Sequence, residues 1–67
     1  MRYFNYEKIA KQARIPADKL LRLRRLTREE FPDDAMLCEL HLLRTCMAIR
    51  DGQLTIEEAL ASDAAAA

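Results

Sequence analysis

The spacing of apolar residues along the chain predicts helices and no strands. Leucine, isoleucine, alanine and methionine recur three or four residues apart, and no segment alternates between apolar and polar residues over a useful length. The commonest residue types, including Leu, Ala, Arg, Glu and Lys, are good helix formers. The chain contains only one glycine and two prolines, which leaves few places to turn. We therefore expect an all-α fold, a small bundle of about four helices.

Capping residues and prolines give the helix boundaries in the first half of the chain. Asn5 is a favoured N-cap, so a first helix is expected from about residue 6 to about residue 13. Pro16 suits the first turn of a helix, and a second helix is predicted over roughly 16–28. Pro32 marks the next break.

The second half of the chain has equally clear boundaries. Asp33 or Asp34 opens a third helix, which runs to about Arg50 with Gly52 as its stop. Residues 55–58, Thr-Ile-Glu-Glu, have the pattern of a capping box that opens a short fourth helix ending near residue 61. Residues 62–67 have nothing to pack against, and we expect them to be disordered. The sequence thus predicts a single helical domain over residues 1–61.

The break near residues 14–16 predicts a helix-turn-helix unit at about 6–28. Such a unit needs an aliphatic and then a small residue in its first helix, a second small residue near the end of that helix, and a hydrophobic residue after the turn. Its second helix buries two aliphatic residues one turn apart. These positions are filled by Ile9, Ala10, Ala13, Ile15, Leu20 and Leu23.

This segment resembles the helix-turn-helix of bacterial transcription regulators, whose turn usually carries glycine where this chain has Arg14. Glycine is wanted there for a positive φ, so Arg14 must accept strain or use a different turn. The stretch LLRTCMAIRDGQLTIEEAL is similar to the end of the MerR-type domain, with Gly52 and Thr55 in matching places. The linker LTREEFPDD is too short for the β-wing of that family. The resemblance implies a DNA-binding regulator, weakly MerR-like and without the wing.

The formal net charge of zero hides a gradient along the chain. Residues 1–28 carry nine basic and two acidic residues, 9 − 2 = +7, and residues 29–67 carry two basic and nine acidic ones, 2 − 9 = −7. The basic half favours a polyanionic partner. The other interpretation is that the two halves neutralise each other within one fold.

The arginines of the second helix are the candidate nucleic-acid contacts. On a helical wheel, Leu20, Leu23, Leu26 and Thr27 share one sector, and four arginines occupy the opposite side with Leu21 among them. In a helix-turn-helix the second helix enters the major groove of double-stranded DNA, and its early residues meet base edges. The expected base-facing residues are Ala17, Asp18, Leu21 and Arg22, and the expected phosphate contacts are Lys11, Arg14, Arg24, Arg25 and Arg28. A plain solvated face and an acidic protein partner are the alternatives.

The third helix carries two apolar stripes. One consists of Met36, Leu40, Leu43 and Met47, and the other of Ala35, Cys38, Leu42, Cys46 and Ile49. Because one stripe is enough to reach the core, the other needs cover from the fourth helix or from another chain. We expect a homodimer built on this helix, with Cys38, Leu42, Cys46 and Ile49 at the dimer or partner interface. A groove for a different protein's helix is the alternative.

Other chemistry is not expected from this composition. Cys38 and His41 are too few ligands for zinc, and the two cysteines are eight residues apart, too far to bridge within one helix. The sequence shows no nucleophile paired with a base and no glycine-rich phosphate-binding loop. We therefore expect no enzymatic activity, cofactor or metal. Free thiols without an apolar leader, and the lack of a long apolar run, favour a cytoplasmic protein without membrane contact.

The sequence is compatible with two functions. The first is a small helix-turn-helix DNA-binding protein, a transcription regulator acting as a homodimer. The alternative is a small helical protein–protein interaction module of antitoxin, inhibitor or adaptor type, which binds a protein partner and not DNA. The fold by itself serves both uses.

Overall fold

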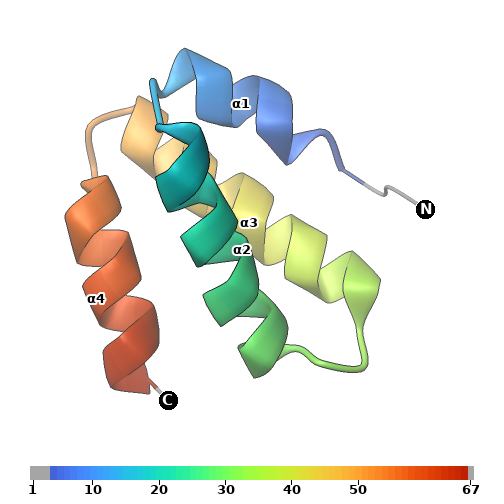
Figure 1. The fold of residues 1–67 in the computed structure, drawn as a ribbon. Helices are drawn as coiled ribbons and strands as arrows, with labels where there is room; N and C mark the ends of the chain where they lie inside the picture. The colour runs from blue at the N-terminus through green and yellow to red at the C-terminus, as the bar shows by residue number, and fades with distance from the viewer. Residues whose placement is uncertain (1–3, 67) are drawn as a thin grey trace.

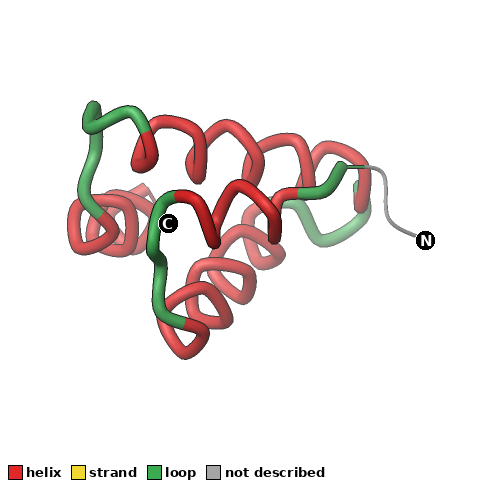
Figure 2. Tube along the Cα trace, turned by 90° about the horizontal axis from the view of Figure 1, so that it is seen from above, coloured by secondary structure: helices red, strands yellow, loops and turns green. Residues whose placement is uncertain are grey.

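The computed structural model describes the backbone of residues 4–66 and the side chains of residues 4–61. It contains four helices (Figure 1), which are α1 (Tyr6–Gln12), α2 (Ala17–Glu30), α3 (Ala35–Arg50) and α4 (Ile56–Ala66). Short loops join them, and no strand occurs among residues 4–66 (Figure 2). The predicted all-α class and the number of helices are confirmed.

The helices pack around one small core. Helix α3 contacts both α1 and α2, and α2 crosses in front of α3 and packs against α4 (Figure 1). The core cluster takes one buried side chain from each helix, namely Tyr6, Leu23, Leu42 and Ala59. Each helix therefore contributes to the same central cluster, and half-buried leucines and isoleucines pack around it.

Three of the four helix starts are fixed by the expected side-chain caps. Asn5 Oδ1 accepts the backbone N–H of Lys8 at 3.3 Å, and Asp34 Oδ1 accepts that of Leu37 at 3.0 Å. Thr55 and Glu58 form the predicted capping box, with Thr55 Oγ1 accepting the Glu58 N–H at 3.1 Å and Glu58 Oε1 accepting the Thr55 N–H at 3.0 Å. These local bonds confirm that the helix starts are encoded in short stretches of sequence.

The second and fourth helices continue beyond their predicted ends. Helix α2 has Pro16 as its N-cap residue and runs to Glu30. It therefore ends only at the turn that precedes Pro32. Helix α4 continues to Ala66, past the predicted end near residue 61 and through most of the segment expected to be disordered. Alanine has the highest helix propensity of all residues, which accounts for this extension. Residue 67 lies outside the described part of the chain.

The turn between α1 and α2 has the same hydrogen bonds as the turn that ends α3. The Ile15 N–H donates to Ala10 O at 3.0 Å and the Arg14 N–H to Lys11 O at 3.1 Å, with Arg14 at φ 59°. At the end of α3, the corresponding bonds join residue 53 to 48 and residue 52 to 49, with Gly52 at φ 80°. Both are Schellman motifs, in which the residue after the C-cap is left-handed. Arg14 therefore adopts a strained left-handed conformation, which was one of the two possibilities that the sequence left open. It occupies the position that glycine fills in the other motif.

This difference gives a stability prediction. We expect Arg14→Gly to raise the free energy of unfolding by up to about 1 kcal/mol, because a left-handed L-residue costs about 1–2 kcal/mol and glycine offsets part of this gain through its greater freedom in the unfolded chain. We expect Gly52→Ala to lower it by about 1 kcal/mol. A Cβ on Gly52 would meet nothing within 4 Å, so only backbone strain opposes it. Thermal unfolding followed by circular dichroism measures both, and a loss of stability in Arg14→Gly would contradict the assignment.

Candidate nucleic-acid interface

Helix α2 has one face that is firmly held in the core. Leu23 and Thr27 are completely buried, and Leu20 and Leu26 are half-buried on either side of them. The Thr27 hydroxyl donates to Leu23 O at 2.8 Å, so this buried polar group is satisfied within the helix. The sector of leucines predicted from the sequence is the buried face, and it fixes the rotation of α2 about its own axis.

The remaining surface of α2 is exposed and carries the arginines. Leu21 is 53% exposed, although leucine normally seeks the interior. All of the residues predicted to face base edges are exposed, as are all of those predicted to contact phosphates. These are Lys11, Arg14, Ala17, Asp18, Leu21, Arg22, Arg24, Arg25 and Arg28.

The arginines of α2 are not neutralised within the described chain. Asp18 and Glu29 lie one helical turn from Arg22 and Arg25, yet no carboxylate among residues 4–61 forms an ion pair with any arginine of α2. The one contact found for these groups is made by Arg24, whose Cζ lies 5.8 Å from the centroid of the Tyr6 ring. This cation–π contact orients the guanidinium without cancelling its charge. The basic surface is thus available to an external anion.

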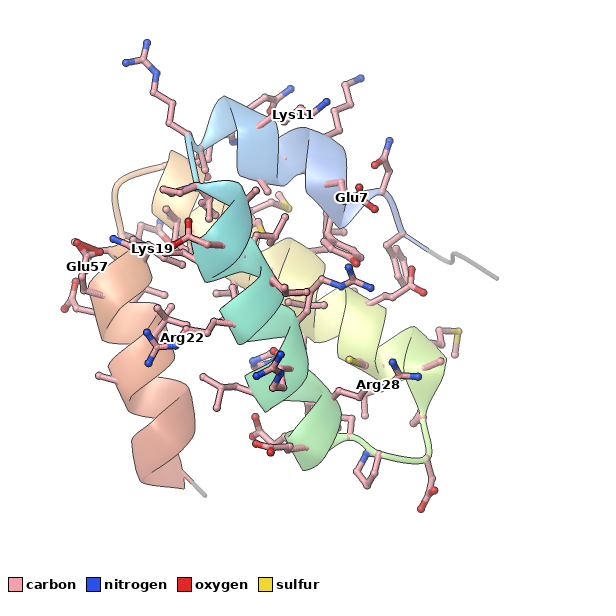
Figure 3. The ribbon with its side chains drawn as sticks, in the orientation of Figure 1. Glu7, Lys11, Lys19, Arg22, Arg28 and Glu57 are labelled. Carbon is pink, nitrogen blue, oxygen red and sulfur yellow. The ribbon has the colours of Figure 1, made fainter. Side chains whose placement is uncertain are left out.

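The basic side chains leave α2 on both of its flanks. Figure 3 shows Arg22 extending toward α4 and Arg28 extending on the opposite side, toward α3, while Lys11 projects from α1. Seen from above, the first turns of α2 project away from α3 (Figure 2). The first turns of α2 are therefore set apart from the backbone of α3.

The boundary between α2 and α4 brings together two opposite charges that the sequence analysis did not pair. Lys19 of α2 and Glu57 of α4 extend toward one another (Figure 3). Lys19 is half-buried and Glu57 is exposed. Nothing in the sequence indicated this proximity, because the two residues are separated by the whole of α3.

A groove on the other flank of α2 was also missed. It has a volume of about 460 Å³ and lies between the second half of α2, the loop around Pro32 and the first half of α3. Its lining includes Leu21, Arg24, Arg25, Arg28, Phe31 and Leu42. The groove forms where three segments meet, so no local pattern could have revealed it. Its lining contains the apolar residues Leu21, Phe31 and Leu42, which we call its apolar floor, and Arg24, Arg25 and Arg28, which we call its basic wall.

Two of the four residues predicted for the dimer or partner interface on α3 lie in the core, and for these two the prediction is wrong. Leu42 is 2% exposed and Cys46 is completely buried, while Cys38 and Ile49 are half-buried against the core. Burial also raises the pKa of the Cys46 thiol to about 11, as expected for a thiol away from water. Leu42 and Cys46 therefore cannot contact a second chain, whereas an interface at the half-buried Cys38 and Ile49 stays a prediction.

The other stripe of α3 remains partly open to solvent. Met36 is 52% exposed and Met47 is 37% exposed, with half-buried Leu40 between them. Leu37, beside this stripe, is 41% exposed. We call Met36, Leu40 and Met47 the outer stripe. Leu43, the remaining residue of the predicted stripe, packs against the core instead.

The described residues offer no assembled metal centre. No group of three or more His, Cys, Asp or Glu side chains within the described residues is placed to hold an ion. Both cysteines are free thiols, and burial raises the pKa of Cys38 while the positive charge of Arg28 opposes the shift. None of the described helices has the length and apolar character needed to cross a membrane.

Comparisons with protein families, with curated proteins and with solved structures gave no match for this chain. The inference of function therefore depends on the surfaces of α2 and α3.

Proposed function

We propose that this protein binds double-stranded DNA through α2 and acts as a small transcription regulator. The observation that carries the proposal is the row of exposed arginines on α2, none of which is paired with a carboxylate of the described chain. A guanidinium group with no ion-pair partner in its own chain is available to form two parallel hydrogen bonds with a phosphate or with the edge of a guanine base. The resemblance of residues 6–28 to the helix-turn-helix of bacterial regulators agrees with this use.

The geometry suggests a division of labour along α2. Its projecting first turns carry Ala17, Asp18, Leu21 and Arg22, which we assign to base edges in the major groove. Five basic residues on the turn, on α1 and further along α2 would contact phosphates on either side, and these are Lys11, Arg14, Arg24, Arg25 and Arg28. Phosphate contacts supply affinity, and the first group supplies sequence preference.

The experiment that tests DNA binding is a salt titration. Fluorescence anisotropy of a labelled duplex pool is measured with the full chain from low to moderate salt. Five phosphate contacts predict that log K falls against log salt with a slope of about −4.5, since each contact contributes about −0.9. A chain that binds no duplex at low salt would remove the proposal.

We further propose that the protein works as a homodimer in which the outer stripe of α3 packs on the same stripe of a second copy. Met36 and Met47 lie toward opposite ends of α3. In an antiparallel dimer, Met36 of one copy therefore packs near Met47 of the other copy, and Met47 of the first near Met36 of the second. Asp33 and Asp34 directly precede α3, and its C-terminal half carries the exposed Arg44. Antiparallel packing brings these opposite charges together.

The dimer gives a second prediction. We expect a variant with Met36→Glu and Met47→Glu to be a folded monomer, because it places like charges on both sides of the contact. Light scattering after size exclusion is expected to give twice 7.7 kDa for the original chain and 7.7 kDa for the variant. Because one short helix buries less than the roughly 800 Å² per partner of a standard interface, we expect dissociation on dilution.

The control for this experiment is Leu21→Ser. It removes an equally exposed apolar side chain from α2 and is expected to leave the dimer intact. A monomeric mass for the original chain at high concentration would contradict the dimer and leave DNA binding by single chains to be judged from the salt titration.

A further inference from the structure

The groove between α2 and α3 has an apolar floor that remains open. Leu21 is the most exposed large apolar side chain of the described residues, and half-buried Phe31 and buried Leu42 line the same groove. Leu42 belongs to the core cluster, so the bottom of the groove reaches the core. A volume of about 460 Å³ lies within the range of about 300–1,000 Å³ that is typical of binding sites. The floor therefore fits apolar side chains inserted from outside.

The wall of the groove is basic. Arg24, Arg25 and Arg28 line it, and none of them has an ion-pair partner among residues 4–61. One acidic residue, Glu39, is part of the described lining, and its Oε1 accepts the Phe4 N–H at 3.0 Å. Arg24 is already positioned by its contact with the Tyr6 ring. An incoming carboxylate thus meets several guanidinium groups, one of them held in place in advance.

We propose that this groove binds an amphipathic helical segment of a partner protein that carries carboxylates beside an apolar stripe. The basic wall selects acidic side chains, and the floor selects leucine- or phenylalanine-sized anchors at helical spacing. DNA satisfies the wall but has no side chains to fill the floor. The juxtaposition of Leu21 and Phe31 with the three arginines is what favours a protein segment at this surface.

The two uses of α2 share Leu21, Arg24, Arg25 and Arg28, which line the groove, but not Arg22. Arg25 lines the groove, whereas Arg22 leaves α2 on the opposite flank, toward α4 (Figure 3). A segment bound in the groove therefore covers part of the proposed phosphate-binding surface. We infer that it displaces DNA, a consequence that rests on the proposed function, whereas the docking itself does not.

The docking test uses a fluorescein-labelled 14-residue peptide in which Leu and Phe recur every three or four residues and the other positions are Glu. Polarisation with the full-length chain is expected to show saturable binding. Replacing the glutamates by glutamine, or the apolar residues by serine, is expected to weaken binding at least tenfold. Among protein variants, Arg28→Ala and Leu21→Ser are expected to weaken it at least fivefold.

The matched control is Arg22→Ala, which removes the same group from the same helix outside the groove and is expected to change peptide affinity less than twofold. Circular dichroism confirms that each variant remains folded. The proposal is overturned if the peptide does not bind, if the serine peptide binds equally well, or if Arg22→Ala weakens binding as much as Arg28→Ala does.

A competition experiment separates this proposal from DNA binding. Unlabelled peptide is added to the complex of the chain with a labelled duplex, and release of the duplex is expected. Peptide binding to a chain that binds no duplex would support the groove and remove the DNA proposal. Simultaneous binding of both ligands would overturn the shared use of Leu21 and the three groove arginines.

Discussion

A variant carrying both Arg22→Ala and Arg25→Ala is expected to bind duplex DNA at least 100-fold more weakly than the original chain. Both side chains are exposed and have no ion-pair partner in the described chain, so their removal costs little stability. A bidentate contact to a base contributes about 1–3 kcal/mol of discrimination. Loss of one base contact and one phosphate contact therefore accounts for the expected effect. Anisotropy at fixed low salt measures it.

Single variants distinguish the two roles. Arg25→Ala is expected to make the salt slope shallower by about one, because it removes one phosphate contact. Arg25→Lys keeps the charge and is expected to retain most of that slope. Lys8→Ala removes one positive charge from an exposed position of α1 and serves as the control, with an expected effect below threefold. Equal losses of DNA affinity for Lys8→Ala and Arg22→Ala would show that the chain attracts DNA by charge alone. Such a result would contradict recognition of bases in the DNA major groove by α2.

Leu23→Ala is expected to lower the free energy of unfolding by about 2–5 kcal/mol, the range found for large-to-small changes in cores. Leu23 has no exposed surface and belongs to the cluster that joins all four helices. A chain of 67 residues has a total stability of only about 3–10 kcal/mol by typical values per residue. Much of the variant is therefore expected to be unfolded at 37 °C, and urea denaturation followed by circular dichroism measures the change.

Leu21→Ala provides the matched control for that experiment. It makes the same substitution two residues earlier in the same helix, at a side chain that is 53% exposed, and is expected to change stability by less than about 1 kcal/mol. Similar losses for the two variants would mean that α2 is rotated about its axis. The basic face would then point elsewhere, and the proposed DNA contacts would fall with it.

The buried face of α2 was predictable because its residues differ sharply in polarity around the helix. Leu20, Leu23 and Leu26 with Thr27 lie on one side and arginines on the other, so only one orientation hides the leucines without burying charge. The exposure of the candidate DNA-binding residues follows from the same contrast. It required no knowledge of the neighbouring helices.

The orientation of α3 was not predictable by the same reasoning. Both of its stripes consist entirely of apolar residues, so the hydrophobic pattern does not rank one above the other. Contacts with α1 and α2 decide the matter by burying Leu42 and Cys46 and leaving Met36 and Met47 outside. The interface prediction was wrong at Leu42 and Cys46 for this reason.

The sequence alone determined where three of the four helices begin, through Asn5, Asp34 and the Thr55–Glu58 box. It also indicated that Arg14 occupies a position where a left-handed conformation, usually supplied by glycine, is needed. These features depend on hydrogen bonds and dihedral angles within a few residues. Only the tertiary structure decided which stripe of α3 is buried and that Leu21, Phe31 and the arginines of α2 share one groove. Those relations join residues far apart in the chain, and packing, rather than local conformational preference, brings them together.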